Sequence, residues 1–357
     1  MLGYCIKLAI FKLAKSGTTL VKSCSMDSYN SGIAFSKSIL LMGVMLIHCN
    51  ILAFCEPPAG LPAVSVIENV MIWCSYCVPL FFMISGYLYF RSFTGFDLQL
   101  FKLKTKKRIF SLVVPYVAWT TIYAVVRVFK ALYLGYDGEG LVVDGNISFI
   151  GFLKGYWDTG DGYPVGFQLW FVRNLIVFVL AAPVVYLFAF RYWALCFMLL
   201  VSVVVGINLH GLEYFTIGAA LALHRIDIDR FSGAYCVSVL VLLAFVSLWH
   251  AADFSVFRMA LTVAILFALT GAVSWSAGRS LLCRLSAGFL FFVYAVHGLY
   301  CSLIDRWLLQ VVGYDTSFRL FACFVLALII IMSVSTFFYW LFCRYCPGLI
   351  GILCGRR

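Results

Sequence analysis

Two histidines inside otherwise apolar stretches are the residues best suited to chemistry in this chain. They are His48 and His297. An ionisable side chain within a membrane span is energetically costly, and it is a functional candidate for that reason. Imidazole exchanges a proton near neutral pH, which suits it to general acid or base catalysis. Two histidines with no carboxylate at their depth make a poor ligand set, so we expect no metal.

The residues that precede each histidine predict its distance from the cytoplasmic edge of the membrane. Lys37 precedes His48 by 11 residues, which on a helix is three turns plus about 20°, so both share a face. The rise between them is roughly 16 Å. Ser286 precedes His297 by the same interval. The sequence therefore predicts two imidazoles at similar depth, one of them above a lysine at the cytoplasmic edge, and this favours function over two packed structural histidines.

A basic run, residues 102–108, enters a later apolar segment. Such a cluster can anchor a helix at the membrane surface. It would equally suit the phosphates of a nucleotide or of coenzyme A, and composition leaves both interpretations open. Arg127 and Arg173 lie toward the ends of apolar segments. Arginine at such a position either extends its guanidinium to water or holds an acceptor substrate in place. The cationic residues of the run are Lys102, Lys104, Lys106, Lys107 and Arg108.

The elements that carry these residues are membrane helices. Of the 357 residues, 64% are hydrophobic and 11% are charged, whereas a soluble domain is nearer half apolar and a quarter charged. A span needs about 20 residues. We predict an all-α, multi-pass helical bundle with about ten spans. They cover residues 33–54, 70–90, 109–134, 169–190, 192–208, 214–223, 231–249, 257–273, 285–304 and 318–342.

The net charge of +11 reflects orientation rather than nucleic-acid binding, because Lys and Arg gather at alternate membrane boundaries. This places both termini in the cytoplasm. The long 135–168 loop, rich in acidic, glycine and aromatic residues, then lies outside, where it either caps the bundle or faces carbohydrate. We divide the chain into a basic segment 1–32, a membrane domain 33–343 and a cytoplasmic tail 344–357. Translation from Met26 and an amphipathic surface helix are equal explanations of the basic segment.

Five motifs in order resemble those of the acyltransferase 3 superfamily of integral membrane enzymes. The resemblance extends from about residue 35 to residue 342. Arginine is common in the family where this chain has Lys37, and the family's Arg-x-x-Arg appears here as Lys104-x-x-Lys107. The motifs are the Lys37 to His48 spacing, Val78-Pro-Leu-Phe-Phe-Met-Ile-Ser-Gly-Tyr-Leu88, Lys107-Arg-Ile109 with Pro115-Tyr116 and Trp119, Leu169-Trp-Phe-Val-Arg173 with Leu175, and Phe291-Phe-Val-Tyr-Ala-Val-His297.

The resemblance implies transfer of an acyl group, which we expect to be acetyl, from cytoplasmic acyl-coenzyme A to a hydroxyl of an extracytoplasmic or lipid-linked glycan. Acyl-coenzyme A would be a co-substrate, with no tightly bound cofactor, and the location would be the inner membrane. His48 would be the general base or a covalent acyl carrier, with His297 and Tyr294 as orienting or acid groups. The residues expected to bind acyl-coenzyme A are Lys37, Lys104, Lys107, Arg108 and Ser85, and those expected to face the acceptor are Arg127 and Arg173.

Two other classes of protein fit part of the pattern. A proton-coupled transporter or flippase would use the buried histidines as a proton relay, but it gives no role to the Lys37–His48 spacing or to the inner basic run. A membrane scaffold explains composition alone. The partners expected of the enzyme are acyl-coenzyme A, a glycan or lipid-linked saccharide, and the bilayer, with no nucleic acid.

Overall fold

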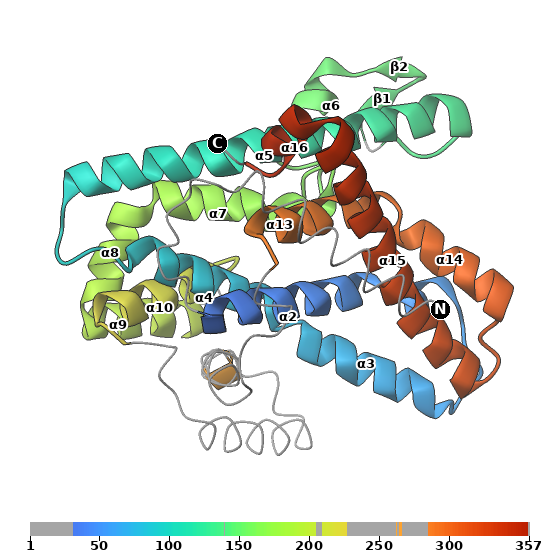
Figure 1. The fold of residues 1–357 in the computed structure, drawn as a ribbon, viewed down its shortest axis with the longest axis horizontal. Coiled ribbons are helices and arrows are strands. Elements are labelled where there is room, and N and C mark those ends of the chain that lie inside the picture. Colours follow the sequence, from blue (N-terminus) through green and yellow to red (C-terminus); the bar gives the residue numbers. More distant parts are fainter. Residues whose placement is uncertain are drawn as a thin grey trace.

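The computed structural model describes residues 31–138, 140–204, 209–226, 262, 264–265 and 285–355. These residues form an all-helical bundle with one short hairpin, as Figure 1 shows, so the predicted all-α class is confirmed. The predicted spans 231–249 and 257–273 lie almost wholly outside the described residues. Most of the basic segment 1–32 lies outside them as well.

The described helices differ widely in length, and several end within apolar sequence. In chain order they are α2 (Ser31–His48), η1 (Ile51–Phe54), α3 (Pro62–Cys74), α4 (Cys77–Phe90), α5 (Leu98–Leu134), α6 (Phe149–Lys154), η2 (Phe167–Leu169), α7 (Trp170–Leu180), α8 (Ala182–Phe190), α9 (Tyr192–Val204), α10 (Leu212–Leu223), α13 (Ala287–Val296), η5 (His297–Leu299), α14 (Cys301–Val312), α15 (Ser317–Tyr345) and α16 (Pro347–Leu353).

Four spans among the described residues are long and apolar enough to cross a membrane: Ile33–Phe54, Pro62–Phe90, Leu98–Leu134 and Ser317–Tyr345. Two bent helix pairs raise that number to six if each pair is one span. The protein is therefore an integral membrane protein. The first of these spans has the bounds predicted from the sequence.

The two bent pairs replace what the sequence predicted as uninterrupted spans. Helices α7 and α8 meet at 74°, where Pro183 lies in the first turn of α8 and cannot continue the hydrogen-bond ladder of α7. Helix α13 meets α14 at 61°, and the turn between them contains His297 and Gly298. The predicted span 285–304 is thus broken close to one of the two candidate histidines.

Helix α5 is a long helix that extends along one side of the bundle in Figure 1. Its 37 residues extend about 55 Å at 1.5 Å per residue, well beyond a hydrocarbon core of about 30 Å. Asp97 caps the first turn by accepting hydrogen bonds from the amides of Gln99 and Leu100. Gly135, in the left-handed region, ends the helix. The basic run therefore occupies one end of α5, and the 135–168 loop begins at the other.

Helices α4 and α10 pack backbone to backbone through two glycines. A Cβ added at Gly86 would collide with the carbonyl oxygen of Phe215, and one added at Gly218 would collide with the carbonyl oxygen of Met83. Small residues allow such close helix contacts in membranes, where van der Waals packing replaces the hydrophobic drive. This contact holds α4, which carries Ser85, against α10.

Replacing Gly86 by alanine is expected to destabilise the bundle, because the new Cβ meets backbone that cannot move without shifting α10. Overpacking of this kind costs about 1–3 kcal/mol. The thermal unfolding midpoint in detergent measures the effect. Gly348→Ala is the matched control, since a Cβ there meets nothing within 4 Å; equal stability of the two variants would contradict the backbone contact.

Candidate active site

His48 and His297 meet at the centre of the fold. Their ring centroids lie 4.9 Å apart, with an angle of 34° between the ring planes. His48 is the last residue of α2, and His297 begins the turn between α13 and α14. The sequence predicted two imidazoles at similar depth, and the structure brings the two rings into contact. Both stand where a helix ends, which frees each ring from the constraint of a helix interior.

The backbone fixes the proton on His297. Its Nδ1 lies 2.6 Å from the carbonyl oxygen of Tyr294, and a carbonyl can only accept a hydrogen bond. Nδ1 therefore carries the hydrogen in the neutral ring, and Nε2 is left with a lone pair. That Nε2 is buried and has no hydrogen-bond partner among the described residues. The site thus contains an imidazole whose Nε2 lone pair is open to accept a hydrogen bond.

The two rings differ in accessibility. His297 is 0% exposed, whereas His48 is half-buried. Phe167, the first residue of η2, packs edge-on against His48 with ring centroids 5.0 Å apart, and Phe167 itself is 43% exposed. His48 is therefore the more exposed ring of the pair, and it lies beside Phe167.

Gln168 ties the segment that carries Phe167 to the segment that carries His297. Its side chain is 2% exposed. Nε2 donates to the hydroxyl of Tyr123 and, at 3.2 Å, to the carbonyl of Ala295. The Tyr123 hydroxyl donates to the same carbonyl at 2.9 Å, and the Tyr294 hydroxyl donates to the backbone carbonyl of Gln168. This network links α5, η2 and α13 around the histidine pair.

Tyr294 consequently has two structural tasks. Its hydroxyl is already a donor to the backbone of Gln168, and its backbone carbonyl orients His297. The sequence left open whether Tyr294 is an orienting or an acid group, and these contacts favour orientation.

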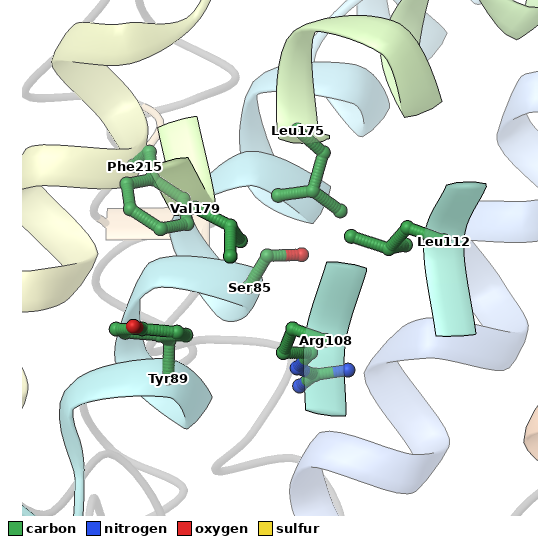
Figure 2. A pocket seen from close by; sticks show the side chains of 7 residues that line it. All are labelled: Ser85, Tyr89, Arg108, Leu112, Leu175, Val179 and Phe215. Atoms are coloured by element: carbon green, nitrogen blue, oxygen red, sulfur yellow. The ribbon is translucent and has the colours of Figure 1, made fainter. Parts of the chain in front are cut away.

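A small pocket between α4, α5, α7 and α10 joins two residues predicted to bind acyl-coenzyme A. Figure 2 shows the Ser85 hydroxyl directed into this pocket and the Arg108 side chain at its border. Both predicted residues thus lie at one site, which we call the Ser85 pocket. Its lining residues are Ser85, Tyr89, Arg108, Leu112, Leu175, Val179 and Phe215.

The other predicted donor-binding residues are placed differently. Lys104 Nζ donates to the carbonyl of Tyr89 at 2.6 Å and lies 4.9 Å from the ring centroid of Phe93. It therefore satisfies a carbonyl at the end of α4, where helices leave such groups unpaired. Lys107 is exposed on α5, and Lys37 is half-buried on α2.

Arg173 secures the 135–168 loop to α7. Its Nη1 donates to the carbonyl of Trp157, and its guanidinium lies 5.2 Å from the centroid of the Trp157 ring system. The loop also folds back along α5, because the Tyr116 hydroxyl donates to the carbonyl of Tyr156. The loop is therefore packed against α5 and α7 and is more than a simple cap on the bundle. The other predicted acceptor-binding residue, Arg127, is half-buried on α5.

Local sequence explains the shape of this loop. The strands β1 (Val142–Val143) and β2 (Asn146–Ile147) pair in antiparallel fashion around Asp144 and Gly145, which both have positive φ, as the two-residue turn requires. Farther on, Asp158 accepts hydrogen bonds from the amides of Gly160 and Gly162, both at 2.8 Å. These two bonds, Gly160 first, lower the pKa of the Asp158 carboxyl, so the carboxylate that organises this turn stays ionised at neutral pH.

Sequence reasoning missed two buried polar residues. Gln168 stands directly before the Leu-Trp-Phe motif, and an amide in an apolar run was the available signal. Asp305 on α14 is 0% exposed, and neither carboxylate oxygen has a hydrogen-bond partner in the part of the chain that the structure describes. Within that same part, no three His, Cys, Asp or Glu side chains gather as a metal site would require.

A family model for the acyltransferase domain matches residues 30–343, most of the chain. The chain belongs to the acyltransferase 3 superfamily. The match confirms the resemblance that the five motifs of this membrane acyltransferase indicated. No curated protein and no solved structure shows a significant match to it.

Removing the hydroxyl of Tyr294 distinguishes orientation from acid catalysis. Tyr294→Phe keeps the carbonyl that orients His297, so acyl transfer should fall by less than about tenfold, whereas loss of a general acid typically costs about 10²–10⁴-fold. The rate of acyl transfer by the purified variant measures this. A loss of a thousandfold with the folded protein intact would make the hydroxyl a participant in the reaction.

Proposed function

We propose that this acyltransferase moves an acetyl group from acetyl-coenzyme A to a hydroxyl of an extracytoplasmic or lipid-linked glycan. The observation that carries the proposal is the contact between His48 and His297, one accessible and the other held with an open Nε2. An alcohol is a weak nucleophile until its proton is removed. A histidine pair in the interior of the helical bundle supplies such a base away from bulk water.

The proton would pass from the acceptor to His48. The half-buried imidazole of His48 takes the hydroxyl proton while the oxygen attacks the thioester carbonyl. The carbon–sulfur bond then breaks, and the thiolate of coenzyme A leaves and takes up the proton. During transfer His48 is a cation, and the lone pair of His297 Nε2 would stabilise it by accepting an N–H hydrogen bond.

The donor would approach from the basic end of α5. Arg108 and Ser85 at the Ser85 pocket support phosphate binding there and entry of the pantetheine arm between α4 and α5. Tyr123, which is bonded to the α13 backbone near His297, lies 15 residues beyond Arg108, or roughly 22 Å along the helix. The long pantetheine arm suits that separation. Lys37 and Lys107 would add positive charge on the same, cytoplasmic side.

The acceptor would approach from the 135–168 loop. Phe167, at the end of that loop, already contacts His48, and Arg173 contacts exposed Trp157 of the same loop. Exposed aromatic rings suit the apolar faces of sugar rings, and Arg127 and Arg173 would orient the glycan. In this orientation both termini are cytoplasmic and the protein lies in the inner membrane.

The role of His48 is tested by two substitutions. His48→Ala should remove transfer by about 10²–10⁴-fold, the usual contribution of a general base, with the protein still abundant and folded in the membrane. His48→Gln keeps hydrogen bonding but cannot shuttle a proton. Radiolabelled acetyl transferred from acetyl-coenzyme A to candidate glycans is the measurement. Recovery of most activity in His48→Gln would leave His48 a positioning role and make His297 the base.

The donor site is tested at Arg108. Because a hydrogen bond to a charged group contributes about 1.5–3 kcal/mol, Arg108→Ala should raise the KM for acetyl-coenzyme A at least tenfold with little change in kcat. Lys106→Ala is the matched control, since Lys106 is exposed on the same helix and does not line the Ser85 pocket. An equal rise in KM for both variants would indicate a diffuse surface charge instead of a bound phosphate.

A further inference from the structure

Gln168 Oε1, like His297 Nε2, is a buried acceptor atom without a hydrogen-bond partner in the described part of the chain. The side chain is 2% exposed, and its Nε2 is already a donor to Tyr123 and Ala295. A buried polar oxygen left without a hydrogen bond costs about 1–3 kcal/mol. A bound ligand that supplies the missing donor would remove this cost.

The position of this oxygen relates it to the histidine pair. The amide of Gln168 packs on the Cα of Gly298, where an added Cβ would lie 2.7 Å from both Nε2 and Oε1. Gly298 directly follows His297, and Phe167, the residue before Gln168, contacts His48. Gly298 therefore admits the amide against the turn that begins with His297, in a space that the Cβ of any larger residue would occupy.

The chemistry of the open atom restricts what can bind. An amide oxygen only accepts, so its partner must present an O–H or N–H donor. The reacting hydroxyl cannot serve both sites, because its single hydrogen goes to the histidine pair. The remaining donor must come from a second group on the same acceptor molecule.

We propose that Gln168 is a specificity-determining residue whose Oε1 accepts a hydrogen bond from a hydroxyl neighbouring the one that is acylated. The preferred acceptor is therefore a diol or polyol and not a simple alcohol. This rests on the proposed acyl transfer to a hydroxyl and narrows it to a class of acceptor. Sites that hydrogen-bond a substrate hydroxyl reject analogues that lack it, because the buried polar atom is then left unpaired.

The test compares two small probe acceptors that differ by one hydroxyl. Purified full-length protein is supplied with radiolabelled acetyl-coenzyme A and either propane-1,2-diol or propan-1-ol, and kcat/KM is measured for each alcohol. The native protein should prefer the diol by about tenfold, the factor that one such hydrogen bond supplies, beyond the factor due to the number of hydroxyls. In Gln168→Met, which has similar length and no amide, the preference should vanish.

Two controls separate the open oxygen from the tether that Gln168 also forms. Tyr123→Phe removes hydroxyl bonds to Gln168 and Ala295 but keeps Oε1, and Gln168→Glu keeps an acceptor oxygen but loses the Nε2 donor. Both should retain the diol preference even if their overall rates fall. A merely structural role for Gln168 would instead lower the rates with both alcohols alike and leave the preference unchanged in Gln168→Met.

The outcomes distinguish the two proposals. Acetyl transfer by the native protein without a preference for the diol, or a preference that survives in Gln168→Met, would overturn the role of Gln168 and leave the acyltransfer proposal standing. Failure of the native protein to transfer acetyl to any alcohol or glycan would overturn the proposed function, and the diol inference with it.

Discussion

The bond between His297 Nδ1 and the carbonyl of Tyr294 is the interaction on which the arrangement of the site depends. Inside a bilayer every backbone polar group needs a partner, so a helix can break only where side chains or packed protein satisfy the freed groups. Helix α13 breaks at His297, and the imidazole itself takes up one of the carbonyls near the break. The same bond fixes the tautomer and leaves Nε2 as the acceptor. The break and the chemistry thus share one cause.

The rest of the bundle keeps this break from relaxing. Gln168 and Tyr123 both satisfy the Ala295 carbonyl, which would otherwise be exposed where α13 ends. Tyr294 is in turn held by the backbone of Gln168. Because these contacts come from α5 and from η2, which directly precedes α7, the site needs the long α5 helix and the bent α7–α8 pair in place. Buried polar networks of this kind are stable when every member has a hydrogen-bond partner. His297 Nε2 and Gln168 Oε1 depart from that rule, because neither has a partner among the described residues.

Much of the architecture and part of the site could be predicted from sequence, for identifiable reasons. The 11-residue interval between Lys37 and His48 lies within one uninterrupted helix, so helical periodicity predicted their shared face correctly. Equal distances to the membrane edge predicted a similar depth for His48 and His297, but their contact arises from the packing of α2 and α13 and could not be predicted. The bend after α13 could not be predicted, because hydropathy does not register a three-residue turn inside an apolar segment. Gln168 was missed for a similar reason: a single amide in an apolar run has no period, and its importance comes from α5 and α13 packing on it.

If the proposed function holds, the two ends of α5 would allow one helix bundle to bring together substrates from opposite sides of a membrane. The basic end presents Arg108 to the Ser85 pocket, while the 135–168 loop returns along the helix to Tyr116. The loop thereby brings Phe167 to His48. Neither substrate would have to cross the bilayer, since a long flexible donor arm and an inward-folded acceptor loop each cover part of the distance. What must remain fixed is the short region between them, and that region is where α2 and α13 both end.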